Sequence, residues 1–276
     1  RQIYRLMDIG TAKPSPAERA RVAHHGLDVV WPNEAYSLAQ YQTDATRAIA
    51  AVGQRGRLPL LVGGTGLYIR AVIDGLAIPR VPPQPELRAA LEAEAATGGA
   101  GVLHARLTAL DPAAAATIDP ANTRRLVRAL EVCIVSGKPF SAQRGARPTP
   151  YQPLVLGLNT ERAALYAWAD QRVEAMLAAG LVTEVEALLA RGYTWDLPAL
   201  SSLGYREIGA ALRGEVALAE ASERMKLATH AYIRRQLTWF RPDARIHWLD
   251  AATPDLTDVA SALVAPWRAA HSAQIG

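Results

Sequence analysis

Cysteine, lysine and long apolar runs are all scarce in this chain of 276 residues. Cys133 is the only cysteine, so no intrachain disulfide can form, as is typical of proteins from a reducing compartment. No apolar run approaches the roughly 20 residues that a membrane-spanning helix needs. The first ten residues, RQIYRLMDIG, are not typical of a signal peptide. We therefore expect a cytoplasmic protein, and a monomer, since nothing in the sequence marks an oligomer interface.

Because lysine is scarce, arginine is the main source of positive charge. Only Lys13, Lys138 and Lys226 are lysines among 30 basic residues, and the net charge is +4. A composition rich in arginine and alanine is typical of a GC-rich genome. Guanidinium groups also fit phosphate oxygens, as in nucleic-acid binding. Net charge does not separate these two interpretations, whereas clustering of the arginines would.

Apolar patterning predicts strands in both halves of the chain and a strand-free helical block between them. Half of the residues are hydrophobic, enough for a sizeable α/β core. The predicted strands are 27–31, 58–62, 154–159 and 246–249, and the predicted helices are 17–25, 36–55, 66–74, 161–190 and 216–241. Proline-rich stretches at 75–85 and 145–153 bound the helical block. We predict a parallel α/β core of residues 1–79 and 151–276, with C-terminal helices, and a helical insertion at 80–150.

The stretch LPLLVGGTGLY (58–68) resembles a buried strand that runs into a ligand loop. It is not a Walker phosphate loop, because no lysine stands at the required offset, and it is not the GxGxxG dinucleotide fingerprint. On its own it could be a tight turn without a ligand. Ser136-Gly137-Lys138 also fails as a Walker loop, and we predict a helix end with Gly137 in the left-handed conformation.

Six stretches, in the same order along the chain, resemble the tRNA dimethylallyltransferase family, also called isopentenyl-tRNA transferases. They are RQIYRLMDIGTAKPS (1–15), HHGLDVVWPNEAYSLAQYQTDA (24–45), PLLVGGTGLYIRAV (59–72), RRLVRALEVCIVSGKPFS (124–141), SSLGYREI (201–208) and HAYIRRQLTWFR (230–241). They lie along almost the whole chain, which makes the resemblance specific, whereas one stretch alone would not be.

The resemblance implies a fold and a reaction. The fold is a P-loop-NTPase-like parallel sheet with an inserted helical domain that binds the tRNA anticodon stem-loop. The reaction moves a dimethylallyl group from dimethylallyl diphosphate to the exocyclic amine of the adenine 3′ of the anticodon, with Mg²⁺ as the expected cofactor. The amine needs a base that removes its proton. The diphosphate needs cations and N–H donors as it leaves, and the adenine must leave the anticodon stack.

The family's first strand, its P-loop and the aspartate that acts as its general base are expected just before Arg1. We therefore assign no catalytic base within the chain and expect Thr65 to support the reaction beside the target adenine. Residues 1–276 alone are expected to be incomplete for prenyl transfer. Gly64 and Gly66 would let substrate approach the backbone closely.

The resemblance also implies binding residues, which divide into tRNA contacts and diphosphate contacts. The tRNA contacts are Arg1, Gln2, Thr65, Arg88, Arg124, Arg125, Arg128, Gly204, Tyr205, Arg206, Arg234, Arg235, Gln236, Thr238, Trp239 and Arg241. The diphosphate candidates are Gly63, Gly64, Arg128 and Arg206. Some of these charges could be ordinary surface pairs, as Glu131 stands three residues after Arg128.

The last of the six stretches shows the spacing of a basic helix face. Arg234, Thr238 and Arg241 follow the i, i+4, i+7 pattern, and Trp239 stands on the next face beside Arg235. Arginines interleaved with aromatic rings suit phosphate contacts and base stacking. The alternative is an amphipathic helix whose aromatics are core. We favour the core for Ile233 and Phe240, and RNA for the arginines.

Other residue types and other functions receive less support. The histidines show no metal-binding spacing, so no metal site is predicted, and Cys133 is expected in the core of a helix. A transferase that prenylates free adenine nucleotides, a P-loop nucleotide kinase and a non-catalytic RNA-binding remnant remain as alternatives. The arginine stretches at 124–128 and 234–241 argue against the first, and the absent Walker lysine against the second.

Overall fold

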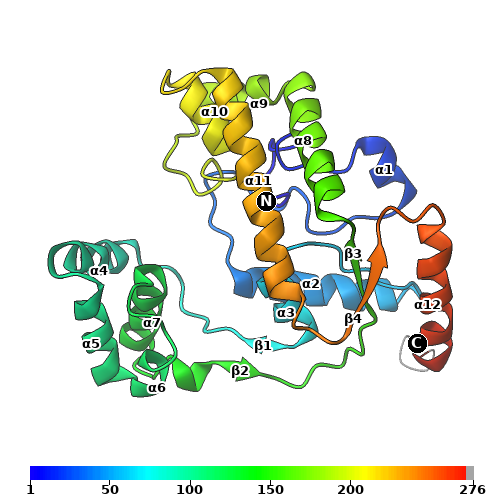
Figure 1. Cartoon of the computed structure of the whole chain (residues 1–276). Helices are drawn as coiled ribbons and strands as arrows, with labels where there is room; N and C mark the ends of the chain where they lie inside the picture. Colours follow the sequence, from blue (N-terminus) through cyan, green and yellow to red (C-terminus); the bar gives the residue numbers. More distant parts are fainter. Residues whose placement is uncertain (272–276) are drawn as a thin grey trace. The chain divides into compact units, whose positions relative to one another are not determined.

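Two strands that lie far apart in the sequence pair in parallel. The structure, a computed structural model, describes residues 1–271 (Figure 1). In it β3 (Val155–Asn159) and β4 (Ile246–Asp250) pair along their full length, with Val155 opposite Ile246. Parallel strands need a long crossover, and the helices between them supply it. The prediction of both strands is confirmed, and the fold is mixed α/β.

The chain divides into two units, which we call the core unit and the helical unit. The core unit is Arg1–Ile69 with Gln152–Gly276, and the helical unit is Arg70–Tyr151. The core unit contains α1 (Pro16–Arg21), α2 (Leu38–Gly53), β3, α8 (Arg162–Ala178), α9 (Leu181–Ala190), α10 (Tyr205–Leu212), α11 (Leu218–Phe240), β4 and α12 (Leu256–His271). Helix α3 (Gly66–Ile73) crosses the division. The first division, at 69/70, lies ten residues before the predicted 79/80, and the second, at 151/152, lies one residue after the predicted 150/151.

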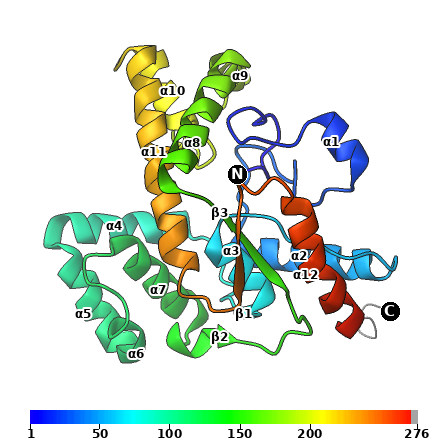
Figure 2. The same ribbon diagram turned by 45° about the vertical axis from the view of Figure 1, so that its right-hand side comes forward.

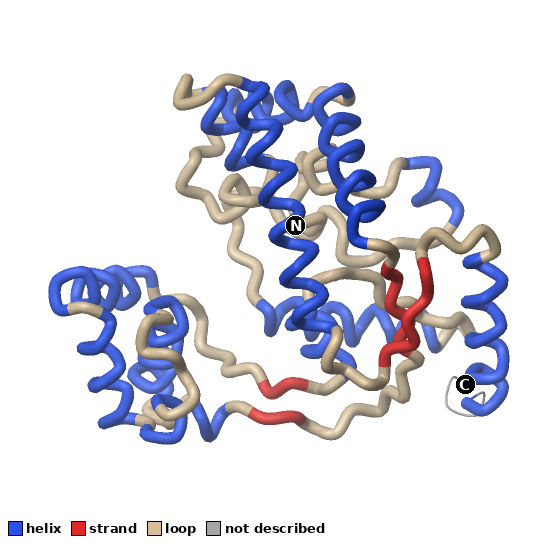
Figure 3. The backbone as a smooth tube through the Cα atoms, viewed as in Figure 1, coloured by secondary structure: helices blue, strands red, loops and turns tan. Residues whose placement is uncertain are grey.

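The helical unit consists of short helices and one small pair of strands. Its elements are β1 (Leu76–Ala77), α4 (Pro85–Gly98), α5 (Ala100–Leu110), α6 (Pro112–Ala115), α7 (Thr123–Ser136), the 3-10 helix Ser141–Gln143 and β2 (Gly145–Ala146). The two strands are antiparallel, and Leu76 stands opposite Ala146. Figure 3 shows both strands in red. Helix α7 ends at Gly137 with φ of 64°, as predicted. Cys133 is buried in the core of this unit with Leu91, Leu103, Leu107 and Leu126, also as predicted.

Two predicted strands are wrong. Residues 58–62 form no strand, and Leu60 and Val62 are 76% and 89% exposed. A strand needs hydrogen bonds from a neighbour, and within residues 1–271 no strand pairs with this segment. In the segment 27–31 only Val30 forms a bridge, to Tyr4. Both segments are rich in apolar residues, but apolar side chains alone do not supply a partner strand, because strand pairing depends on the tertiary structure.

The helices of the structure differ from the predicted helices in three places. The helix expected over 161–190 is broken by Gly180, whose φ of 97° places it in the left-handed region. Helix α10 lies outside the predicted helices, and the Glu207 carboxylate accepts the Gly204 amide at 2.8 Å and caps its start. Helix α12 lies outside the predicted helices and contains Pro266. None of the described helices is long and apolar enough to cross a membrane.

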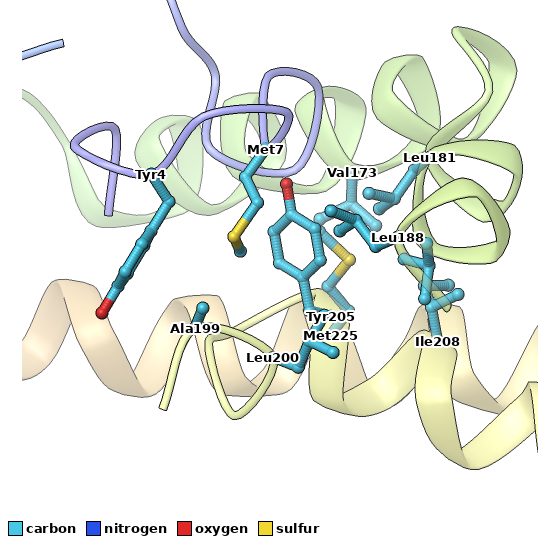
Figure 4. Close-up of a cluster of buried hydrophobic side chains, with 11 residues drawn as sticks. Tyr4, Met7, Val173, Leu181, Leu188, Ala199, Leu200, Tyr205, Ile208 and Met225 are labelled. Atoms are coloured by element: carbon cyan, nitrogen blue, oxygen red, sulfur yellow. The ribbon is translucent and has the colours of Figure 1, made fainter. Parts of the chain in front are cut away.

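The core unit is built around apolar side chains from α8 to α11 and from the N-terminal segment. Tyr4, Met7, Leu181, Leu188, Tyr205 and Met225 are among the buried members of this cluster. Figure 4 shows Tyr205 in its middle, with the hydroxyl pointing toward the segment that carries Met7. Helices α8 and α11 lie side by side (Figures 1 and 2). Helix α11 contributes Met225 of its N-terminal half to this cluster, while its C-terminal half carries the candidate site.

Candidate RNA interface

The glycine loop at 63–66 and the basic half of α11 lie in contact, although the sequence separates them by more than 160 positions. The Gln236 side-chain amide donates to the Gly64 carbonyl at 3.0 Å, and the Tyr232 hydroxyl donates to the same oxygen at 3.4 Å. The Tyr232 and Thr65 hydroxyl oxygens are 3.5 Å apart. Two stretches predicted separately as binding elements therefore form one surface in the core unit.

Two glycines of this loop, Gly64 and Gly66, lie close to side chains of α11. A Cβ at Gly66 would lie 1.8 Å from Trp239 Nε1, and one at Gly64 would lie 1.9 Å from Gln236 Nε2. The side of each glycine on which a Cβ would stand therefore faces α11, and close approach of a substrate to their backbone stays a prediction. Gly63 is open, since a Cβ added there would have no atom within 4 Å. Within the described residues, the amides of Gly63, Gly64 and Thr65 make no hydrogen bond.

Alanine at position 66 is expected to displace Trp239. Alanine is a better helix former than glycine, so any loss of stability would come from the clash. Overpacking of this kind costs about 1–3 kcal/mol. Gly66→Ala should lower the midpoint of urea unfolding and change the tryptophan fluorescence of the native protein. Gly63→Ala is the matched control and should change neither; an unchanged spectrum in both variants would contradict this packing.

The exposed face of α11 carries cations that no carboxylate neutralises. Arg234, Arg235 and Arg241 are exposed, and none of them pairs with an acidic group in the described part of the chain. A shallow hollow of about 520 Å³ is lined by Ala231, Arg234, Arg235, Thr238 and Trp239. Unpaired guanidinium groups at a surface hollow suit phosphate oxygens.

The aromatic residues of α11 and its Ile233 differ in exposure. The Trp239 ring is 44% exposed while its nitrogen lies against Gly66, so one part of the ring is available for stacking. Ile233 is 9% exposed and belongs to the core, as predicted. Phe240 is half-buried. The Arg235 guanidinium lies over the Tyr232 ring, 5.8 Å from its centre.

In the helical unit, one buried carboxylate joins two of the predicted arginines. Glu131 is fully buried and accepts from Arg88 Nε at 2.7 Å, from Arg128 Nη1 at 2.5 Å and from the Gln84 amide at 2.7 Å. Arg128 also donates to the carbonyls of Pro79 and Val81. These contacts give both arginines a role in the fold of this unit. Their direct contact with tRNA or diphosphate stays a prediction.

Two further arginines stand at the start of α7. Arg124 and Arg125 are exposed, and neither makes an ion pair within residues 1–271. They are the arginines of the helical unit's predicted set whose charge is open to a ligand. The sequence spacing places Arg124 and Arg128 on one face of the helix. The structure shows that Arg128 forms an ion pair with Glu131, whereas Arg124 does not.

The ion pairs at Glu131 predict a pH-dependent stability for the helical unit. Burial alone raises the pKa of Glu131, but hydrogen bonds from Arg88, the Gln84 amide and Arg128 outweigh it and lower the pKa to about 2. A depressed pKa stabilises the fold above the ordinary value near 4.5, and this stabilisation declines as the pH falls toward 2. Glu131→Gln should therefore lower the free energy of unfolding by about 1–3 kcal/mol at pH 7.

The difference between native protein and Glu131→Gln should narrow as the pH is lowered from 4.5. Urea titration followed by circular dichroism at several pH values measures it. Glu94→Gln is the matched control, because Glu94 forms a partly exposed pair with Arg106 in the same unit. That change should cost less than about 1 kcal/mol. A Glu131→Gln cost that stayed constant with pH would contradict the assignment.

Tyr205 is a correction to the predicted set of tRNA contacts. Its ring is fully buried, and its hydroxyl donates to Glu184 Oε1 at 2.5 Å. Burial and this hydrogen bond raise the pKa of Tyr205. The same carboxylate accepts the amides of Asp8, Ile9 and Gly10 at 2.7–3.1 Å. Tyr205 therefore holds the N-terminal segment to the helices and offers no surface to RNA.

The neighbours of Tyr205 also have structural roles. Gly204 has φ of 90° and starts α10, where a side chain would be strained. The Arg206 side chain is exposed and pairs with Glu207 at 2.5 Å. Gln2 donates its side-chain amide to the carbonyls of Thr11 and Ala12, and Arg1 is exposed, with its guanidinium 6.0 Å from the centre of the Tyr4 ring. Arg1 and Arg206 remain accessible to a ligand.

No group of three or more histidine, cysteine, aspartate or glutamate side chains in residues 1–271 converges as a metal site. Sequence reasoning missed Glu184 and the pair Tyr166 and His230. Tyr166 with Asp170 and His230 with Arg234 show i, i+4 spacing in the sequence, whereas Glu184 has no such partner, since positions 180 and 188 are Gly and Leu.

Comparison with known proteins identifies the family. The model of the IPP transferase family matches residues 2–243. The chain belongs to the IPP transferase family. A protein of Roseiflexus sp. (strain RS-1) named tRNA dimethylallyltransferase is 55% identical over 267 residues, which cover 97% of this chain and 88% of the relative. The resemblance found in the six sequence stretches is thereby confirmed.

Solved structures of IPP transferases share the fold. The full-length tRNA isopentenylpyrophosphate transferase of Bacillus halodurans is 38% identical, with a TM-score of 0.67 over 95% of this chain and 84% of that one. A eukaryotic dimethylallyltransferase acting on tRNA is 26% identical, with a TM-score of 0.78 over 96% of this chain and 69% of that one. These neighbours support the predicted P-loop-like α/β fold class.

Proposed function

We propose that this protein transfers the dimethylallyl group of dimethylallyl diphosphate to the exocyclic amine of the adenine 3′ of the anticodon in tRNA. The exposed face of α11 supports the proposal: it carries arginines that pair with no acidic group in the described residues and a 44% exposed Trp239. The same helix contacts the glycine loop through Gln236 and Trp239. Family membership and relatives named tRNA dimethylallyltransferase support the same reaction.

In this reaction the amine nitrogen forms a bond to the allylic carbon. The bond between that carbon and the diphosphate oxygen breaks, the diphosphate leaves with the bonding electrons, and the proton of the nitrogen passes to a general base, for which we assign no residue of this chain. The described residues contribute binding and orientation. Thr65 would stand beside the target adenine, and the free amides of Gly63 and Gly64 can donate to a phosphate oxygen. Arg206 adds a cation whose charge Glu207 partly offsets.

The partner we propose is the tRNA anticodon stem-loop. Arg234, Arg235 and Arg241 would bind its phosphates, and Trp239 would stack on an unpaired base. Arg124 and Arg125 would bind RNA from the helical unit, since they too lack an acidic partner in the described residues. We also propose that the protein is cytoplasmic and acts as a monomer, with Mg²⁺ bound through the diphosphate oxygens.

A competition between acceptors tests the proposal. The product of the complete gene is incubated with labelled dimethylallyl diphosphate, unmodified tRNA and AMP, and the label is located by nucleoside mass spectrometry. Label in the adenine beside the anticodon supports the proposal. Preferential label in AMP would overturn it in favour of a nucleotide prenyltransferase. Tight tRNA binding without any transfer would indicate an RNA-binding protein that does not catalyse.

A further inference from the structure

Two pairs of side chains interlock between α8 and α11 beside the hollow. Tyr166 and Asp170 stand four residues apart on α8, and His230 and Arg234 stand four residues apart on α11. The spacing places each pair on one face of its helix. The rings of Tyr166 and His230 are stacked, with centres 4.0 Å apart and planes 7° apart.

The His230 ring is held from a second side. Its Nε2 lies 2.8 Å from Asp170 Oδ1, and the histidine side chain is only 16% exposed. An imidazole that is both stacked and hydrogen-bonded has little rotational freedom. Tyr166, which lies flat against it, is held in turn.

The Tyr166 hydroxyl accepts a hydrogen bond from Arg234 Nη1 at 3.2 Å. Arg234 lines the hollow on α11, and within the described residues the Tyr166 hydroxyl is the only hydrogen-bond partner of its guanidinium group. Arg235 has no comparable partner, because its guanidinium only lies over the Tyr232 ring at 5.8 Å. The structure therefore restrains one of the two neighbouring arginines more than the other.

We propose that Tyr166 is a positioning residue that directs the Arg234 guanidinium toward a tRNA phosphate, with His230 and Asp170 fixing the tyrosine. The proposal rests on the proposed function of α11 as an RNA-binding face. An arginine loses rotamer freedom when it binds a phosphate, and prior restraint reduces that loss. A neutral hydroxyl provides this restraint without competing as a carboxylate would.

A double-mutant cycle on tRNA binding tests the positioning role. Tyr166→Phe keeps the stacked ring and removes only the acceptor. We expect it to weaken binding of unmodified tRNA about three-fold, with an unchanged melting temperature and salt dependence. Arg234→Ala should weaken binding about ten-fold and make the salt slope shallower. The double variant should bind no more weakly than Arg234→Ala alone. Tyr193→Phe is the control, because its hydroxyl makes no hydrogen bond in the described residues.

Two neutral variants of Asp170, which have the same net charge, extend the test. Asp170→Asn keeps a side-chain oxygen for His230, and Asp170→Ala does not. The alanine variant should bind tRNA about three-fold more weakly than the asparagine variant. If Tyr166→Phe weakened tRNA binding by the same factor in the native protein and in the Arg234→Ala variant, the positioning role would be wrong, while the RNA-binding face of α11 would stand. If Arg234→Ala itself left tRNA binding unchanged, the proposed RNA face and the positioning role would both be wrong.

Discussion

Tyr205→Ala is expected to lower the free energy of unfolding by about 3–5 kcal/mol, the cost of removing a large aromatic side chain from a core. The ring is fully buried among Met7, Leu181 and Met225. Its loss would also leave Glu184 without its hydroxyl donor. Urea unfolding followed by circular dichroism measures the change.

Tyr205→Phe separates the two parts of this effect. It keeps the ring and removes the hydroxyl, so the loss should fall to about 1–3 kcal/mol, the cost of leaving a buried polar group with one partner fewer. In both variants, tRNA affinity measured well below the melting temperature should change little. An alanine variant that kept its stability but lost tRNA affinity would restore Tyr205 as an RNA contact and refute its assignment to the core.

The double variant Arg234→Ala/Arg241→Ala is expected to bind tRNA about 100-fold more weakly than the native protein. Hydrogen bonds to charged groups contribute about 1.5–3 kcal/mol each, so ten-fold per arginine is a low estimate. Each lost phosphate contact should also make the salt slope shallower by about 0.7–0.9, because fewer counterions are released. Anisotropy titrations of labelled tRNA at several salt concentrations measure both quantities.

Arg191→Ala is the matched control for charge. Arg191 is exposed at the end of α9 and makes no ion pair in the part of the chain that the structure describes. Its removal should weaken binding less than three-fold. The melting temperature of every variant must stay near that of the native protein, because arginine stems also pack against the surface. Equal losses from Arg191→Ala and Arg234→Ala would show that only net charge attracts the tRNA.

Local chemistry makes several helices predictable. The Ser37 hydroxyl accepts the Gln40 backbone amide at the start of α2, and the Ser37 backbone amide donates to the Gln40 side-chain oxygen. This capping box can be recognised within four residues of sequence. Gly137 ends α7 in the left-handed conformation that only glycine adopts without strain. The apolar run at 154–159 forms β3 because its partner β4 is present to pair with it. The apolar run at 58–62 predicts a strand in the same way, but no described strand pairs with it, and no strand forms.

The candidate site is predictable in its members but less so in their roles. The arginines and Trp239 of α11 are exposed, as RNA contacts must be, and this agrees with their spacing. The sequence assigns the glycines at 64 and 66 to a substrate, whereas Gln236 and Trp239 occupy the space beside them. It assigns Arg128 to ligands, whereas Glu131 and two backbone carbonyls bind it.

The family, the helical character of the middle of the chain and the basic face of α11 can all be predicted from the amino-acid sequence. Those properties reside in residue order and in spacings of three to seven positions, which a single chain displays directly. The folded chain is needed to show that Tyr205 is core, that Glu131 joins Arg88 and Arg128, and that the glycine loop lies against α11. Each of these depends on burial or contact between residues distant in sequence. Side-chain type states what a residue can bind, but the folded neighbours determine which of those partners it meets.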